Sequence, residues 1–313
     1  MKPGRVFTTL HHRICFLTAF GVAAAGFSTL HAQDLEPRAY SNSPTGLSFL
    51  IAGYAYSQGT VLPDPSLPVD NAHYESHTEL LAYATTLNVL GKSAKVDAIV
   101  PFVSLSGHAD FLGMQRQRSV DGFADPLLRF SINFYGAPAL TAAQFRSYKQ
   151  NVIIGGSFRV GLPLGQYDDT KILNIGSHRW SFKPELGISK AFGPLTCEFA
   201  PGVTFYTDNG DYLFGRTREQ TPLLALKGGV TYSFAPSLWL SLNVSYFKGS
   251  RSTVDDVLNN DTQQGVRLGT TLAVPVTRQQ SVKLFADTGW DSHRDNAFNS
   301  LGVVWQYRFG GGF

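Results

Sequence analysis

Apolar and polar residues alternate along much of this chain. Near the C-terminus, every second position of residues 301–309 carries an apolar side chain, and Trp305, Tyr307 and Phe309 are the large aromatics among them. Strict alternation of this kind is the pattern of a β-strand with one apolar face and one wetter face. The segment is longer than the about 5–6 residues usual for strands in globular proteins. This strand alone does not show whether its apolar face contacts a protein core or lipid, so the other segments have to decide.

The same alternation recurs along the chain and predicts twelve strands. Most of them are long enough for a tilted strand that crosses a membrane, which needs ~9–11 residues. The predicted strands are residues 46–58, 77–90, 94–105, 123–135, 151–162, 179–190, 195–207, 222–234, 237–248, 264–274, 281–290 and 299–309.

The connections between these strands alternate in length. Short turns such as 91–93 and 193–194 are followed, one strand later, by long polar loops such as 249–263. Short turns on one side and long loops on the other are the layout of outer-membrane barrels. Residues 136–150 break the rule, and their sequence predicts a short amphipathic helix near 138–149 on the turn side.

The physics of lipid favours closure of these strands into a ring. Hydrocarbon offers no hydrogen-bond partner, so each backbone amide and carbonyl must pair within the protein, which only a helix or a closed barrel achieves. The predicted fold class is all-β: a closed antiparallel transmembrane β-barrel of about 12 strands. A secreted soluble sandwich is the alternative, and it would show shorter strands and a polar terminal residue.

The N-terminus has the composition of a secretory signal peptide. Lys2, Arg5 and Arg13 precede an apolar run over residues 14–27, and a small-residue cleavage site precedes Gln33. The run is shorter than the ~20 residues that a spanning helix requires. We therefore expect a cleaved signal peptide at 1–32.

Two further regions follow the predicted signal peptide. Residues 33–45 are predicted to be an N-terminal segment in the periplasm or in the lumen, where they could act as a plug. Residues 46–313 are predicted to form the barrel.

Charge and cysteine usage exclude several classes of partner. The chain has 26 Lys and Arg against 23 Asp and Glu, and the three cations of the leader account for the difference. The expected mature protein is therefore neutral, and nucleic-acid binding draws no support from its charge. Cys15 lies in the leader, which leaves Cys197 alone, so neither a disulfide nor a thiolate metal site is expected. No cofactor is implied.

Charged residues fall on the wetter side of the predicted strands. An Arg or Lys facing lipid near the midplane would cost about 2–4 kcal/mol, so we expect these side chains to point into the lumen. They either pair across strands as a structural filling or line a pore that selects solutes by charge, and both functions can coexist. The predicted lumen set is Lys95, Asp97, Arg129, Arg159, Lys183, Glu185, Lys227, Arg267, Lys283, Asp287 and Arg308, to which the same pattern adds Glu198.

The C-terminal strand resembles the signal by which bacterial outer-membrane proteins are recognised by their assembly machinery. The residues that carry this resemblance are Gly302, Trp305, Tyr307, Phe309 and the terminal Phe313. The barrel-assembly machinery is therefore an expected partner during biogenesis, followed by outer-membrane lipid and lipopolysaccharide.

Three stretches resemble the outer-membrane "MetA-pathway of phenol degradation" family. They are residues 34–50, residues 136–150, and residues 162–193 with the sequence LPLGQYDDTKILNIGSHRWSFKPELGISKAFG. The resemblance implies a twelve-stranded barrel that is presumed to pass small molecules. The name of the family reflects gene neighbourhood, so no substrate follows from it.

The sequence gives little support to catalysis or to metal binding. Gly155-Gly156-Ser157 lacks the spacing of a hydrolase nucleophile elbow. Ser177 and His178 are adjacent, and strand neighbours point to opposite faces, so they cannot pair as nucleophile and base on a strand. The pair His73 and His77 and the acidic loop stretches 208–211 and 255–256 are expected to be solvated, and no metal site or catalytic residue is predicted.

The function predicted from sequence is therefore a passive outer-membrane channel for small solutes, with aromatic compounds and organic acids as the candidates. A structural or surface-binding barrel with a sealed interior remains an alternative. An outer-membrane hydrolase is the third hypothesis.

Overall fold

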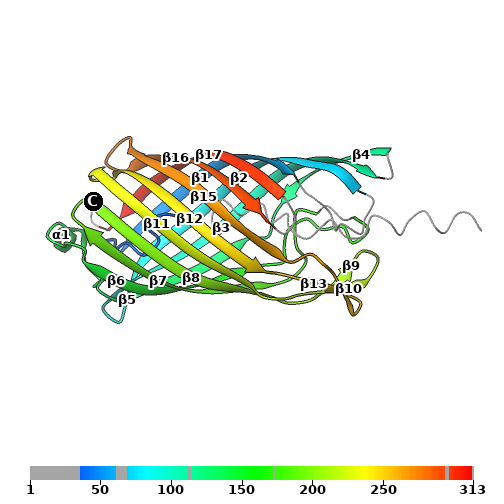
Figure 1. The fold of residues 1–313 in the computed structure, drawn as a ribbon. Coiled ribbons are helices and arrows are strands. Elements are labelled where there is room, and N and C mark those ends of the chain that lie inside the picture. Colours follow the sequence, from blue (N-terminus) through cyan, green and yellow to red (C-terminus); the bar gives the residue numbers. More distant parts are fainter. Residues whose placement is uncertain (1–35, 61–68, 112–113, 172–173, 293–295, 312–313) are drawn as a thin grey trace, which may run out of the picture.

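The computed structural model describes residues 36–60, 69–111, 114–171, 174–292 and 296–311. Within them, twelve long strands form a single ring, which is drawn lengthwise in Figure 1. These strands are β1 (Leu47–Thr60), β2 (Val69–Val89), β3 (Lys92–Phe111), β5 (Leu127–Tyr135), β6 (Val152–Gly161), β7 (Ser181–Phe192), β8 (Leu195–Tyr206), β11 (Leu223–Ala235), β12 (Leu238–Gly249), β15 (Gln263–Pro275), β16 (Gln280–Asp291) and β17 (Asn296–Gly310).

The ring is closed by hydrogen bonds between the first and the last strand. β1 pairs antiparallel with β17 on one side and with β2 on the other, and β2 pairs with β3. Every further strand pairs with its neighbours in sequence order, through β5, to return to β3. The predicted closed antiparallel barrel of twelve strands is therefore confirmed. The turns 90–91 and 193–194 contain glycines with positive φ, Gly91 and Gly193, as tight hairpin turns require.

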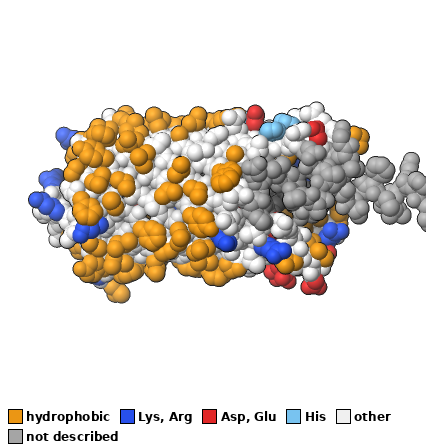
Figure 2. Space-filling model, viewed as in Figure 1, with side chains coloured by type: hydrophobic (Ala, Val, Ile, Leu, Met, Phe, Trp, Pro, Cys, Tyr) orange, Lys and Arg blue, Asp and Glu red, His pale blue; other side chains and the backbone are white. Residues whose placement is uncertain are grey.

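Alternation along each strand produces two different surfaces. On β12, Ser241 points inward and is 1% exposed, whereas the next residue, Leu242, points outward and is 63% exposed. Figure 2 shows apolar side chains over most of the length of the barrel and charged side chains near its ends. An apolar band around a closed barrel is the surface that hydrocarbon covers in a membrane.

The barrel wall extends beyond the predicted strands on the long-loop side. β2 begins at Val69 instead of His77, and β3 continues to Phe111 instead of residue 105. An unpredicted strand, β4 (Met114–Phe123), pairs with the outer half of β3. The strand predicted at 123–135 begins only at Leu127, because the preceding residues connect β4 to the barrel. Polar hairpins hydrogen-bond as well as apolar ones, so pairing continues where the hydrophobic pattern ends.

Smaller elements lie at the two ends of the barrel. The long-loop end carries a second sheet of β9 (Asn209–Tyr212), β10 (Arg216–Gln220), β13 (Ser252–Val254) and β14 (Val257–Leu258). At the turn end, α1 (Ala142–Phe145) lies within the predicted 138–149 and begins at a capping box formed by Thr141 and Gln144. No helix in the described part of the chain is long and apolar enough to span a membrane.

The apolar band makes a direct prediction for Leu242. The substitution Leu242→Arg places a cation against hydrocarbon and should lower the free energy of unfolding by about 2–4 kcal/mol. Urea titration of the protein refolded in lipid vesicles measures this loss. Leu258→Arg is the matched control, because Leu258 is also exposed but lies in the small sheet outside the band. Equal losses for the two variants would contradict the lipid-facing assignment.

Candidate functional site

A cavity of about 710 Å³ lies inside the barrel. Its walls are the inward faces of β1–β3, β5, β6, β11, β12 and β15–β17, together with residues 36–39 and 41–44 of the N-terminal segment. Seven of the predicted lumen residues line it: Lys95, Asp97, Arg129, Arg159, Lys283, Asp287 and Arg308. The other five, Lys183, Glu185, Glu198, Lys227 and Arg267, lie on inward faces of the wall but do not line this cavity.

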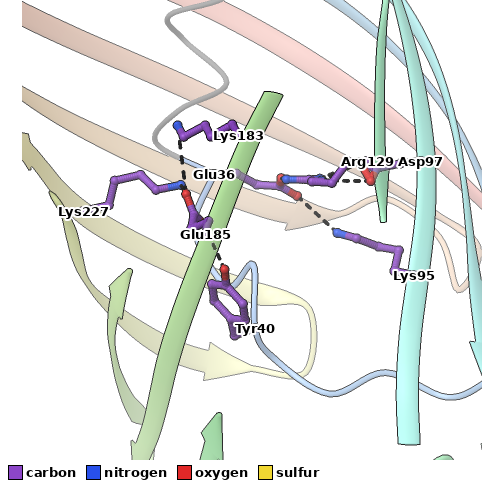
Figure 3. A network of polar contacts seen from close by, with 8 residues as sticks. All are labelled: Glu36, Tyr40, Lys95, Asp97, Arg129, Lys183, Glu185 and Lys227. Atoms are coloured by element: carbon purple, nitrogen blue, oxygen red, sulfur yellow. Dashed lines mark hydrogen bonds and ion pairs between the residues drawn. The ribbon is translucent and has the colours of Figure 1, made fainter. Parts of the chain in front are cut away.

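The first polar cluster joins β3, β5 and the N-terminal segment (Figure 3). The Nε and Nη2 groups of Arg129 donate to the Asp97 carboxylate at 2.6–2.9 Å, a forked geometry that makes strong pairs. The other guanidinium nitrogen, Nη1, lies 2.6 Å from Glu36 Oε2. Lys95 Nζ lies 3.7 Å from Glu36 Oε1. Glu36 therefore supplies a carboxylate that the barrel wall does not provide at this position.

The second polar cluster surrounds Glu185 on β7. Lys227 Nζ from β11 lies 2.5 Å from Glu185 Oε2, and Lys183 Nζ lies 4.0 Å from the same oxygen. The Tyr40 hydroxyl donates to the other oxygen, Oε1, at 3.0 Å. A buried carboxylate is stable only when its oxygens have such partners. The two clusters thus tie the segment to two places on the wall, β5 and β7, which are separated by β6 (Figure 3).

Tyr40 fits into a recess built from glycines. A Cβ on Gly187 would lie 2.0 Å from Tyr40 Cε2, and one on Gly155 would lie 2.9 Å from Cδ1. Only residues without a side chain leave room for the ring here. Asn133 Nδ2 donates to the Tyr40 carbonyl at 3.3 Å. Tyr40 is 3% exposed, so the segment is packed into the wall rather than lying loosely across the lumen.

The rest of the segment is fixed at the turn end. Asn42 Nδ2 donates to the Pro138 carbonyl at 3.2 Å, and Thr86 Oγ1 donates to the Pro44 carbonyl at 2.7 Å. Residues 36–45 therefore lie inside the barrel at its turn end. The sequence pattern did not single out Glu36 or Tyr40, because neither belongs to an alternating segment.

Apolar side chains line the same cavity. They come mainly from β1, β16, β17 and the neighbouring strands, and their inward position interrupts the simple rule that the wetter face looks in. They include Phe49, Ile51, Leu80, Ile99, Phe285 and Val304. The cavity is therefore amphipathic, with cations and apolar surface available to one solute.

Comparison with known proteins identifies the family. The family model for the "MetA-pathway of phenol degradation" matches residues 46–309. The chain belongs to this family. A search of the curated proteins found no match.

Solved structures share the fold of this family member. The COG4313 outer membrane channel from Pseudomonas putida F1 aligns with a TM-score of 0.72 and 17% identity, over 88% of this chain and 100% of that chain. The translocator domain of the autotransporter NalP from Neisseria meningitidis aligns with a TM-score of 0.50 and 11% identity, over 90% and 95% of the two chains. The fold and its apolar band assign the MetA-pathway family member to the bacterial outer membrane.

The long-loop end carries two neighbouring arginines that the hydrophobic pattern does not single out. Arg179 lies 4.5 Å from the centre of the Tyr206 ring, and Arg218 lies 5.2 Å from that of Tyr212. Burial, helped by the nearby Arg218 guanidinium, lowers the pKa of Arg179 to about 10. Arg218 lies on β10, which has no counterpart among the predicted strands, and Arg179 precedes β7, so only the folded arrangement brings the two together.

The candidate catalytic pair is separated in the MetA-pathway family member. Ser177 and His178 lie before β7 rather than on a strand, so the predicted strand geometry does not apply to them. Ser177 Oγ donates to Asp125 Oδ2 at 2.5 Å, whereas His178 Nε2 lies 3.1 Å from Asp211 Oδ2. Each side chain has its own carboxylate partner, and no nucleophile–base contact joins the two.

The candidate metal ligands are also accounted for. His73 and His77 lie within β2 instead of a loop, but both side chains are exposed, as expected of solvated histidines. His73 stacks on His108, and His77 Nδ1 lies 2.7 Å from the Tyr54 hydroxyl. Within the described ranges, no three His, Cys, Asp or Glu side chains form a group that could hold a metal ion.

The predicted assembly residues lie on β17. Trp305, Tyr307 and Phe309 stack along the outer face, with ring centres 6.2 and 5.8 Å apart. A Cβ on Gly302 would lie 2.2 Å from Phe285 Cζ. The aromatic ring of Phe285, on β16, therefore leaves room only for glycine at this position. Phe313 lies outside the described residues.

Proposed function

We propose that this barrel is a passive outer-membrane channel for small solutes and that the seven cavity-lining charged residues named above set its selectivity. The observation that carries the proposal is a closed barrel with a charged cavity of about 710 Å³ inside. Selectivity would arise from charge and hydrogen bonding along the wall, as in other pores.

Charge on the inward faces favours anions. Eight Lys and Arg side chains of the predicted lumen set are opposed by four carboxylates, with Glu198 included. Two ion pairs in this set, Arg129 with Asp97 and Lys227 with Glu185, cross between strands, as the structural alternative requires. A wall with surplus cations still raises the local concentration of anions. Organic acids are therefore the solutes best matched to this lumen.

Conductance in planar lipid bilayers tests the channel directly. The purified mature protein should produce discrete current steps in potassium chloride, with anions more permeant than cations. A barrel that inserts but passes no current would instead be a sealed structural or surface-binding barrel. The separated Ser177 and His178 give the hydrolase hypothesis no support. The proposed partners during biogenesis are the barrel-assembly machinery, then lipid and lipopolysaccharide.

A further inference from the structure

Glu36 occupies an anion position of the cavity without being part of the barrel wall. Asp97 takes the Nε and Nη2 groups of Arg129, and Nη1 is left to Glu36 at 2.6 Å. Lys95 approaches the second Glu36 oxygen at 3.7 Å. If Glu36 moved away, Arg129 and Lys95 would share the single carboxylate of Asp97.

Only another anion can replace Glu36 at low cost. A neutral solute would leave Arg129 Nη1 and Lys95 with unbalanced charge in a partly buried site, which is unfavourable. A carboxylate restores both contacts, because its two oxygens match the spacing of a guanidinium and an ammonium partner. Lys283 lines the same cavity and adds to the attraction.

The body of the solute would contact the apolar lining. Phe49 and Phe285 line the cavity together with Ile51 and Val304. The cavity volume lies within the range of ~300–1,000 Å³ that suits small molecules. Burial of an apolar ring against such surface is favourable, so a compact carboxylate with an apolar body uses both kinds of lining.

We propose that the cavity binds a small monocarboxylate with an apolar body, which takes the place of the Glu36 carboxylate on Arg129 and Lys95 and loosens residues 36–45. This inference rests on the proposed channel function and specifies its substrate class and its gate. The solute opens its own path, because displacing Glu36 removes the ion pairs that anchor the start of the segment. The second anchor, Tyr40 on Glu185, remains to reseat the segment afterwards.

The tethered carboxylate sets how strongly solutes must compete. A group held on a short segment has an effective concentration in the millimolar range, roughly, before any packing is counted. The solute can bind the wild-type protein only while Glu36 is away from the site. The apparent affinity is therefore the intrinsic affinity multiplied by the fraction of time for which the site is vacant. Removing the Glu36 charge should therefore increase affinity.

Calorimetric titration of the detergent-solubilised protein with benzoate tests the competition. Glu36→Gln should bind benzoate about tenfold more tightly than wild type, which corresponds to about 1.4 kcal/mol. Glu219→Gln makes the same charge change on an exposed residue of β10 and should match wild type. Benzyl alcohol, which lacks the charge, and acetate, which lacks the ring, should each bind Glu36→Gln at least roughly tenfold more weakly than benzoate.

Two outcomes would overturn the inference. One is equal benzoate affinity in wild type and Glu36→Gln, and the other is benzyl alcohol binding as tightly as benzoate. If Glu36→Gln does not fold, Gly187→Ala serves instead, since it displaces Tyr40 and should likewise tighten benzoate binding. Conductance in potassium chloride is measured without benzoate and tests the channel separately. A barrel that conducts but does not bind benzoate refutes the inference and still supports the channel. A silent barrel that binds benzoate refutes only the channel.

Discussion

Gly187→Ala should raise the single-channel conductance roughly two- to fivefold, because it removes the segment that narrows the lumen. The new Cβ would lie 2.0 Å from Tyr40 Cε2 and 2.3 Å from two further ring atoms, far inside van der Waals contact. The Tyr40 ring is 3% exposed and has no space to shift within its recess. The ring must therefore leave, and its hydrogen bond to Glu185 is lost with it.

The loss of Tyr40 should free the middle of the segment. Without the ring, residues 36–45 keep the Glu36 ion pairs and the contacts of Asn42 and Pro44 at the turn end. These contacts hold only the two ends of the segment, so residues 37–41 lose their fixed position against β6 and β7. Planar-bilayer recordings should show larger steps or frequent transitions to a larger open level.

Gly228→Ala is the matched control for this prediction. Gly228 lies on β11, where an added Cβ would find Val244 Cγ1 at 3.6 Å, an ordinary contact. Its conductance should equal that of wild type. If Gly187→Ala folds and also conducts like wild type, then residues 36–45 do not limit the current and their position inside the barrel has no role in permeation.

The hydrophobic pattern was sufficient to predict the barrel but not its contents. Alternation such as that of Ser241 and Leu242 depends on one solvent on each face, and it persists wherever lipid touches the strand. Beyond the lipid both faces meet water, so β4 and the outer part of β2 carry no such signal. The inward position of Phe49 and Phe285 was also not predicted, because a strand with apolar residues on both faces does not reveal which face points into the barrel.

The hydrophobic pattern likewise predicted only part of the candidate site. Charges on alternating strands were placed inside by the cost of putting them in lipid, and that argument holds for Arg129 and Lys183 alike. It cannot say which charge meets which, since register and shear decide that Glu185 lies beside Lys227. Glu36 and Tyr40 precede the first strand and carry no period, so only the folded chain brings them to the wall.

Substituting Arg159→Glu together with Arg308→Glu should abolish the anion preference of the channel. Both residues line the cavity, on β6 and β17. The change converts eight inward cations against four carboxylates into six against six. Potentials of several kT along a narrow, low-dielectric wall depend on this balance, so the anion-to-cation permeability ratio should fall roughly fivefold.

These two positions are better suited to the test than Lys227. Lys227 lies 2.5 Å from Glu185, and its replacement by Glu would set two carboxylates side by side in the wall. The loss of that pair would also disturb Tyr40, which donates to Glu185. A change in ion selectivity could then not be separated from a displacement of residues 36–45. A reversal-potential measurement across a salt gradient gives the permeability ratio directly.

Arg146→Glu with Lys149→Glu supplies the same charge change outside the lumen. Both residues are exposed at or just after α1, at the turn end. Salt screens exposed charges over about 10 Å at 0.1 M ionic strength, so this pair should shift the ratio little. An equal shift in the two double variants would mean that the net charge of the protein, and not the wall of the cavity, governs ion preference. A shift confined to Arg159 and Arg308 would link selectivity to the inner face of the barrel, because the two variants differ only in where the charges lie.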